Sequence, residues 1–215
     1  MIMKIMKRMV LMAAGVGLVV ACNNPTTPDP TPAPIDIITF TDERDGQIYR
    51  AVKIGTQVWM AENLNYDIPD NLADLCYDNS ADSCAKYGRL YNRVDALAAC
   101  PTGWHLPSNE EWTTLTDFVG TKAGTKLKSS TGWYGYSGVP VGTDNYGFAA
   151  LPGGTIDYSG YYSNFAGEAG FWWSSTKDNF GFYIWSMSVL EEAETVHSGR
   201  DGLGHSLYSV RCIQD

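Results

Sequence analysis

The chain has 215 residues and carries 15 Lys and Arg against 24 Asp and Glu, which gives a formal net charge of −9. With this excess of acidic residues, the chain lacks the net positive charge through which proteins bind nucleic acids or anionic bilayers. With 44% hydrophobic and 18% charged residues the chain is not disordered, and its length predicts one domain or two small ones.

The N-terminus has the pattern of an export signal. Residues 4–8 hold three bases, and Met9 to Ala21 is a run of 13 apolar residues and glycines. A membrane-spanning helix needs about 20 residues, so this run fits a secretory signal peptide better. Because Leu18 to Cys22 resembles the bacterial lipobox, we expect residues 1–21 to be removed and Cys22 to be lipidated. The alternative is an ordinary signal peptide with a chance cysteine.

A proline-rich tether is predicted for residues 22–38. Asn23 to Asp36 contains five prolines interleaved with threonines, which excludes helix and sheet and favours polyproline II. At about 3.1 Å per residue, the tether would hold the following domain, residues 39–215, roughly 40 Å from the membrane. A plain disordered linker is the alternative, and it differs only in stiffness.

Lipidation of Cys22 leaves four cysteines in the domain. In an exported domain an even set predicts two disulfides, and four cysteines allow three pairings. The residues between Cys76 and Cys84 are polar and turn-forming, so we expect these two to pair, which leaves Cys100 with Cys212. A zinc site is the rival interpretation, but the sequence has no Cys-x-x-Cys and its histidines lack ligand spacing.

The front half of the domain indicates strands, a polar insertion and a helical segment. Residues 40–45 are turn-like. Alternating side chains over 48–54 predict a strand, and the glycine after it, followed by 58–60, predicts a hairpin. Residues 67–83 are a polar insertion that carries the local disulfide, and residues 91–99 have helical character.

The clearest helix signal follows Trp104. Ser108 with Glu111 three residues later forms a capping box. Apolar side chains then recur at helical spacing from Trp112 to Val119, and Gly120 supplies a stop. A second short helix is predicted within 122–128.

The rear half is irregular at first and then stranded. Trp133 to Phe165 holds nine aromatic residues and seven glycines, and only Phe148 to Leu151 resembles a strand. Residues 171–173, 182–189 and 207–213 are apolar or alternating and predict the closing strands of an antiparallel sheet. Helices in front and strands behind predict the α+β class.

Six blocks of sequence follow one another in a recognisable order. They are Val52 to Asn65, Cys84 to Tyr91, Cys100 to Trp112, Gly147 to Gly154, Trp172 to Thr176 and Ser209 to Cys212. Together they closely resemble the Fibrobacter succinogenes major paralogous domain over residues 40–215. That family implies no particular biochemical activity.

The segment Trp104 to Trp112 also resembles the Arg-Leu-Pro-Thr-x-x-Glu-Trp segment of formylglycine-generating enzymes, which have a C-type-lectin-like fold. This resemblance implies small antiparallel sheets with two helices, a long irregular loop region and terminal strands that meet. It also implies two disulfides, one of them long-range. We therefore expect an α+β fold of the C-type-lectin-like type.

Neither the oxidase nor the lectin chemistry of these folds is expected. Formylglycine-generating enzymes bind copper through free thiols, whereas the four domain cysteines are assigned to disulfides. The Glu-Pro-Asn, Gln-Pro-Asp and Trp-Asn-Asp motifs of calcium-dependent lectins do not occur. A structural calcium among Asp144, Asn145 and Asp157 stays open. No metal site and no cofactor is predicted.

The histidines do not indicate a hydrolase. His105 is expected to be a hydrogen-bonded fold residue rather than a base, and His197 and His205 to be exposed in a glycine-rich loop. The sequence also lacks the Gly-x-Ser-x-Gly nucleophile turn. We therefore expect no enzyme activity.

Aromatic residues of the long loop region are the ligand-binding candidates. They are Tyr134, Tyr136, Tyr158, Tyr161, Tyr162 and Phe165. Planar rings at a surface can stack on pyranose faces, and tyrosine adds a hydroxyl at low entropic cost. The alternative is that these rings pack the loops against the domain. The tryptophans of the blocks are expected in the core: Trp104, Trp112, Trp172 and Trp173.

The sequence thus predicts a bacterial cell-envelope lipoprotein, at the outer membrane or cell surface, that displays a non-catalytic recognition or adhesion domain. Extracellular polysaccharide is the leading ligand class. The expected partners are the membrane, through the N-terminal lipid, and a polysaccharide, but no nucleic acid. A structural surface or assembly component without a soluble ligand is one alternative, and an enzyme of unrecognised type is another.

Overall fold

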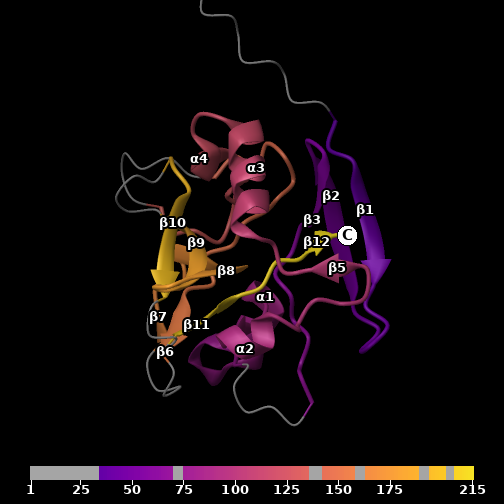
Figure 1. Cartoon of the computed structure of the whole chain (residues 1–215), viewed down its shortest axis with the longest axis vertical. Helices are drawn as coiled ribbons and strands as arrows, with labels where there is room; N and C mark the ends of the chain where they lie inside the picture. Colours follow the sequence, from indigo (N-terminus) through magenta and orange to yellow (C-terminus); the bar gives the residue numbers. More distant parts are fainter. Residues whose placement is uncertain (1–33, 70–74, 136–141, 158–162, 189–193, 202–205) are drawn as a thin grey trace, which may run out of the picture. The chain divides into compact units, whose positions relative to one another are not determined.

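The computed structural model describes residues 34–69, 75–135, 142–157, 163–188, 194–201 and 206–215 (Figure 1). The helices in these residues are η1 (Tyr77–Asn79), a 3₁₀ turn, and α1 (Ala81–Tyr87), α2 (Arg93–Ala96), α3 (Asn109–Val119) and α4 (Ala123–Leu127). The strands in the front half are β1 (Ile37–Thr41), β2 (Ile48–Ile54), β3 (Gln57–Met60), β4 (Leu90–Tyr91) and β5 (Trp104–His105). Those in the rear half are β6 (Thr155–Asp157), β7 (Ser163–Asn164), β8 (Ala169–Asp178), β9 (Gly181–Ser188), β10 (His197–Asp201), β11 (Ser206–Ser209) and β12 (Ile213–Gln214). No helix in this part of the chain is long and apolar enough to cross a membrane.

The first sheet of the described residues has the strand order β1-β2-β3-β12-β5. The hairpin of β2 and β3 is confirmed, with Ile54 opposite Gln57 and the left-handed Gly55 (φ +62°) in the turn. The C-terminal strand β12 lies between β3 and β5 and pairs with both through Ile213 (Figure 1). The two ends of the domain therefore meet in one sheet, as expected.

The second sheet has the order β10-β9-β8-β11-β6-β7, and β4 also pairs with β11. Two predicted closing segments lie in β8 and β9, which form a long antiparallel hairpin. The third, 207–213, is divided between β11 in this sheet and β12 in the first sheet, so it is not the single strand expected. The expectation of a wholly antiparallel sheet is wrong at one point, because β11 pairs with β8 in parallel through Ser209 and Trp172. Two small sheets with a few helices place the fold in the α+β class, as predicted.

Helix α3 begins and ends where its sequence signals lie. The Ser108 hydroxyl accepts a bond from the Glu111 backbone N–H, and the Glu111 side chain accepts one from the Ser108 N–H. The capping box is therefore complete at the N-terminus. The apolar side chains at Trp112, Leu115 and Val119 are buried, which seats the helix on the core.

Four segments differ from their predictions. The turn-like segment 40–45 contains the end of β1, so the first strand begins at Ile37 rather than after the tether. The helical segment 91–99 contains only the four residues of α2, whereas the polar insertion holds η1 and the start of α1. Phe148 to Leu151 makes a single bridge, from Ala150 to Lys128, and no strand. Helices of four and seven residues are too short to produce a clear periodicity. The described residues therefore contain four α-helices, whereas the fold resemblance implied two.

Tryptophans form the centre of the core, as expected. Trp112 packs against Trp59, Trp172 and Trp185, with ring centroids 4.8, 6.3 and 5.8 Å apart. Trp172 and Trp173 are also fully buried, and Trp104 is 9% exposed. Because aromatic pairs add to the energy of area burial, this cluster joins α3 to both sheets.

Candidate functional site

A buried polar network lies at the junction of the sequence blocks. The Asn63 amide oxygen accepts bonds from Trp172 Nε1 at 2.9 Å and from Arg211 Nη2 at 2.8 Å. The Asn63 Nδ2 donates to the Tyr87 carbonyl at 2.8 Å and to Ser209 Oγ at 3.3 Å. Four segments that are distant in sequence, those of Asn63, Tyr87, Trp172 and Ser209 to Arg211, are thus joined through one amide, and Asn63 lines a pocket.

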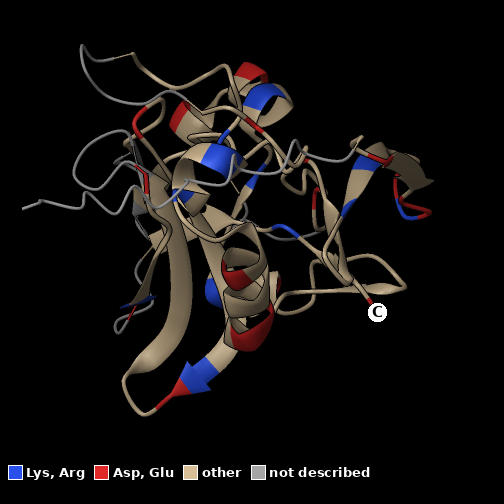
Figure 2. Cartoon of the chain, turned by 90° about the horizontal axis from the view of Figure 1, so that it is seen from above, with Lys and Arg blue, Asp and Glu red and all other residues tan. Residues whose placement is uncertain are grey.

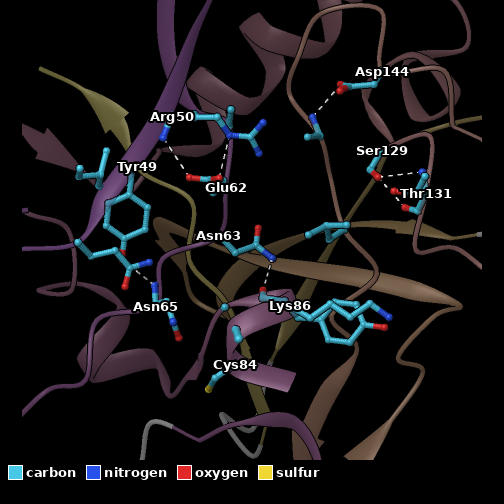
Figure 3. Close-up of a pocket in the computed structure, with 18 of the residues that line it drawn as sticks. Tyr49, Arg50, Glu62, Asn63, Asn65, Cys84, Lys86, Ser129, Thr131 and Asp144 are labelled. Carbon is cyan, nitrogen blue, oxygen red and sulfur yellow. Dashed lines mark hydrogen bonds and ion pairs between the residues drawn. The ribbon is translucent and has the colours of Figure 1, made fainter. Parts of the chain in front are cut away.

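The pocket has a volume of about 430 Å³ and lies between β2, the segment after β3, α1 and two loops (Figure 3). Its lining residues are Gln47 to Arg50, Ala61 to Asn63, Asn65, Cys84 to Gly88, Ser129 to Thr131, Asp144, Ala149 and Leu151. The volume falls within the roughly 300–1,000 Å³ typical of small-molecule sites. Unlike most such sites, it is lined mainly by polar side chains.

One side of the pocket carries an ion pair. The backbone N–H and Nε of Arg50 donate to the two carboxylate oxygens of Glu62, at 3.0 and 2.8 Å. Only one of the two donors belongs to the guanidinium, so the contact ties Glu62 to both the backbone and the side chain of Arg50. Lys86, on the exposed side of α1, places its Nζ 4.5 Å from the Tyr87 ring centroid. Two cations therefore lie at the pocket, one of them already paired.

The opposite side is made by short polar loops. Asp144 Oδ1 accepts a bond from the Ala149 N–H at 2.8 Å. The Ser129 hydroxyl accepts from the Thr131 N–H and donates to the Thr131 carbonyl. Burial raises the pKa of Asp144 above its usual value, although the Ala149 hydrogen bond acts in the opposite direction. These loops face Arg50 across the pocket in Figure 3.

The charges around the pocket are of both signs. Figure 2 shows Lys and Arg positions scattered among Asp and Glu positions rather than gathered on one element. At the pocket itself, Arg50 and Lys86 are accompanied by Glu62 and Asp144. The site therefore lacks the single-sign field that would concentrate a highly charged ligand.

The predicted ring residues fall into two groups. Tyr134 and Phe165 lie in the described residues and are 57% and 49% exposed. Both flank the turn at residues 165–169, because the Tyr134 N–H donates to the Gly167 carbonyl at 2.7 Å. The other four candidates lie outside the described residues: Tyr136, Tyr158, Tyr161 and Tyr162.

The cysteine pairing is confirmed. Cys76 bonds to Cys84, and Cys100 bonds to Cys212. The first disulfide ties the segment before η1 to α1, and Cys84 itself lines the pocket. Cys22, the predicted lipidation site, lies outside the described residues.

The histidines partly match their predictions. His105 Nδ1 bonds to Asp215 and Nε2 to Glu111, at 2.7 and 2.9 Å, so it is the hydrogen-bonded fold residue expected. His197 is half-buried at the start of β10 rather than exposed in a loop, because its strand pairs with β9. His205 lies outside the described residues.

The described residues do not support the hypothesis of a structural calcium ion. They contain no group of three or more His, Cys, Asp or Glu side chains that could hold a metal ion. Asp144 instead binds the Ala149 N–H, Asn145 donates its backbone N–H to the Lys126 carbonyl, and Asp157 pairs with Ser206 in β6–β11.

Residues 52–214 match the family model described as the Fibrobacter succinogenes major domain. The chain belongs to this family. The match confirms the resemblance carried by the six blocks. No curated protein and no solved structure matches the chain.

Sequence reasoning missed the pocket, although part of its lining lies within the six sequence blocks. Arg50 is two residues before the first block, Glu62 and Asn63 are inside it, and Lys86 is inside the second. A usable signal was the presence of polar residues beside buried ones in the first two blocks. Only the fold shows that these blocks meet.

Proposed function

We propose that this protein is a cell-envelope lipoprotein whose family domain is a non-catalytic recognition module for extracellular polysaccharide. The observation that carries the proposal is the pair of half-exposed rings, Tyr134 and Phe165, at one turn. Flat rings at a protein surface offer a large contact area with little rotamer entropy to lose. A C-type-lectin-like architecture remains a prediction that fits the meeting of the terminal strands.

The two rings are held by the turn between them. The Phe165 carbonyl accepts bonds from the N–H groups of Glu168 and Ala169, each at 2.9 Å. The Phe165 ring packs edge-on against Phe171, with centroids 6.2 Å apart. Any side chain at Gly167 would collide with the Tyr134 ring, 2.6 Å from the position of the added carbon. Both rings are therefore pre-positioned, which lowers the entropic cost of binding.

Substitution of the rings tests the proposal. Tyr134→Ala and Phe165→Ala should each weaken retention on a polysaccharide array by about 1 kcal/mol or more, as aromatic anchors do at interfaces. The matched control is Phe180→Ala, because Phe180 is 74% exposed on the β8–β9 turn. Unchanged retention would contradict the proposal. A loss of about 3–5 kcal/mol of stability would show instead that the rings pack the core.

The membrane anchor has its own test. We expect Cys22→Ser to release the protein from the membrane fraction or to stall its processing, because Cys22 follows an apolar signal and precedes the proline-rich tether. The measurement is membrane fractionation with intact mass. A variant that matures, stays membrane-bound and keeps an unchanged mass would contradict the lipid assignment.

One observation favours a structural or assembly role as a second candidate. Four isoleucines are exposed near the edge of the first sheet: Ile35 before β1 (43%), Ile37 and Ile38 in β1 (49% and 42%) and Ile48 in β2 (66%). β1 is the edge strand of its sheet. An apolar edge strand can pair with another chain. If this role is correct, sedimentation should show concentration-dependent association, and Ile37→Lys should abolish it.

A further inference from the structure

The side chains around the pocket retain hydrogen-bonding capacity that the described residues do not use. Arg50 bonds to Glu62 through its backbone N–H and Nε, and its terminal Nη groups make no bond within the described residues. Lys86 stacks on Tyr87 without a hydrogen-bond acceptor in this part of the chain. Asp144 uses Oδ1 for Ala149 and leaves Oδ2 without a described partner. Donors and acceptors are therefore both available on facing sides.

One residue of the pocket lining, Asn65, has a buried hydrogen-bond acceptor without a partner in the described part of the chain. The Oδ1 atom of Asn65 is buried and has no hydrogen-bond partner among the residues described. The Asn65 backbone N–H donates to the Tyr49 hydroxyl at 3.0 Å, which fixes the residue at the wall. An unpaired buried acceptor costs about 1–3 kcal/mol. Because Oδ1 itself is buried, a ligand hydroxyl would reach this atom only after the amide of this pocket-lining residue turns toward the pocket.

The walls are also pre-formed. The α1 wall is tied to the preceding segment by Cys76–Cys84 and to the core by the bond from Asn63 to the Tyr87 carbonyl. The opposite wall is closed by the Asp144–Ala149 bond. A site that needs no ordering on binding loses less conformational entropy.

The chemistry of the walls selects the class of ligand. A phosphate or carboxylate would meet Glu62 and Asp144, and a cation would meet Arg50 and Lys86. A hydroxyl both donates and accepts, so a compact ligand with several hydroxyls can use all of these groups without a buried unpaired charge.

We propose that this pocket is a second binding site, which takes one neutral sugar residue or a polyol of similar size. This pocket is separate from the surface formed by Tyr134 and Phe165. Its assignment rests on the proposed function only in that an extracellular polysaccharide would supply the ligand. A sugar bound here would present the rest of a polysaccharide outside the pocket. The pocket would select the sugar residue, while the rings would bind along the chain.

Ligand-observed NMR on the full chain tests this proposal with defined probes. These are the methyl glycosides of glucose, galactose, mannose, xylose and N-acetylglucosamine, with glucuronate and inorganic phosphate as charged competitors. A detergent without a sugar head group is needed, since alkyl glycosides would compete. We expect at least one neutral glycoside to bind more tightly than either anion. If none binds, or if an anion binds most tightly, the proposal is wrong.

Two pocket variants and one matched control locate the binding. Lys86→Met and Asp144→Asn should each weaken glycoside binding roughly ten-fold, the value of one hydrogen bond to a charged group. Lys86 is exposed, and Asp144→Asn keeps the acceptor used by Ala149, so both variants should fold. Lys53→Met removes an exposed charge from β2 outside the pocket and should leave binding unchanged. Equal affinities in all three variants would overturn the assignment.

The variant Tyr134→Ala distinguishes a failure of the pocket proposal from a failure of the proposed polysaccharide binding by the surface rings. Tyr134→Ala should lose polysaccharide retention but keep full glycoside binding, because its side chain does not line the pocket. If the glycosides bind to the pocket while no polysaccharide is retained, the ring surface fails and the pocket stands. If Tyr134→Ala abolishes glycoside binding, the pocket proposal is wrong.

Discussion

Arg211 is the residue whose burial most needs an explanation. It is 0% exposed, and burial lowers its pKa to about 9. Its guanidinium donates to the Asn63 amide oxygen and to the carbonyls of Phe148 and Ala149, and it lies 4.4 Å from the Phe148 ring centroid. Carbonyl dipoles and a ring face thus solvate the charge in place of a carboxylate. The network links the pocket residue Asn63 to the core, which fixes the positions of the pocket walls.

The surface residue His105 makes a pH-dependent contribution to the stability of the fold. Burial alone lowers the pKa of His105, but its hydrogen bonds to Asp215 and Glu111 outweigh this effect and raise the pKa above the usual value. A raised folded-state pKa means that the stabilisation is fully present below the unfolded value of about 6.5. It is lost as the pH rises through the folded-state value.

We therefore predict that His105→Gln destabilises the protein more at pH 5 than at pH 9. The difference should be about 0.2–1 kcal/mol, since the ring is 42% exposed and its ion pairs are screened. Urea unfolding at the two pH values measures it. Asp215→Asn is the control and should shrink the pH dependence without removing it, because Glu111 remains. An equal loss at both pH values would contradict the prediction.

At the scale of the elements, prediction succeeded where the signal was local. The capping box of Ser108 and the alternation of β2 each lie within a few residues, so both elements were found. Helix α1 was missed because its seven residues are too few to show a clear apolar periodicity, and the disulfide holds it to the preceding segment. The parallel contact of β11 with β8 was missed because strand neighbours are chosen by tertiary packing.

Prediction of the candidate site also depended on whether the sequence signal was local. Tyr134 and Phe165 were identified because aromatic residues among glycines stand out locally, and both are half-exposed. The pocket depends on contacts such as Asn63 with Arg211, which are 148 residues apart in sequence. No local pattern reports such a contact. The polar residues of each block therefore looked like ordinary surface residues until the fold brought them together.

At the scale of the whole domain, the two disulfides differ in what they hold. Cys76–Cys84 closes a separation of 8 residues and secures one wall of the pocket. Cys100–Cys212 closes a separation of 112 residues. It joins the segment before β5 to the residue before β12. The bond therefore holds β12 in its place between β3 and β5. The long-range bond therefore supports the fold, and the local bond supports the site.

This difference predicts unequal losses when each bond is removed. Cys100→Ala with Cys212→Ala should cost roughly 4–5 kcal/mol, and Cys76→Ala with Cys84→Ala roughly 2–3 kcal/mol, by the loop-closure entropy. Alanine avoids placing a hydroxyl at Cys212, which is 0% exposed. Denaturant unfolding of both double variants gives the two losses, and the reduced wild type, which lacks both bonds, sets the lower limit of stability. Glycoside binding should fall more in the Cys76/Cys84 variant, because α1 forms a pocket wall. A larger stability loss from the local bond would show that the chain-entropy argument fails here.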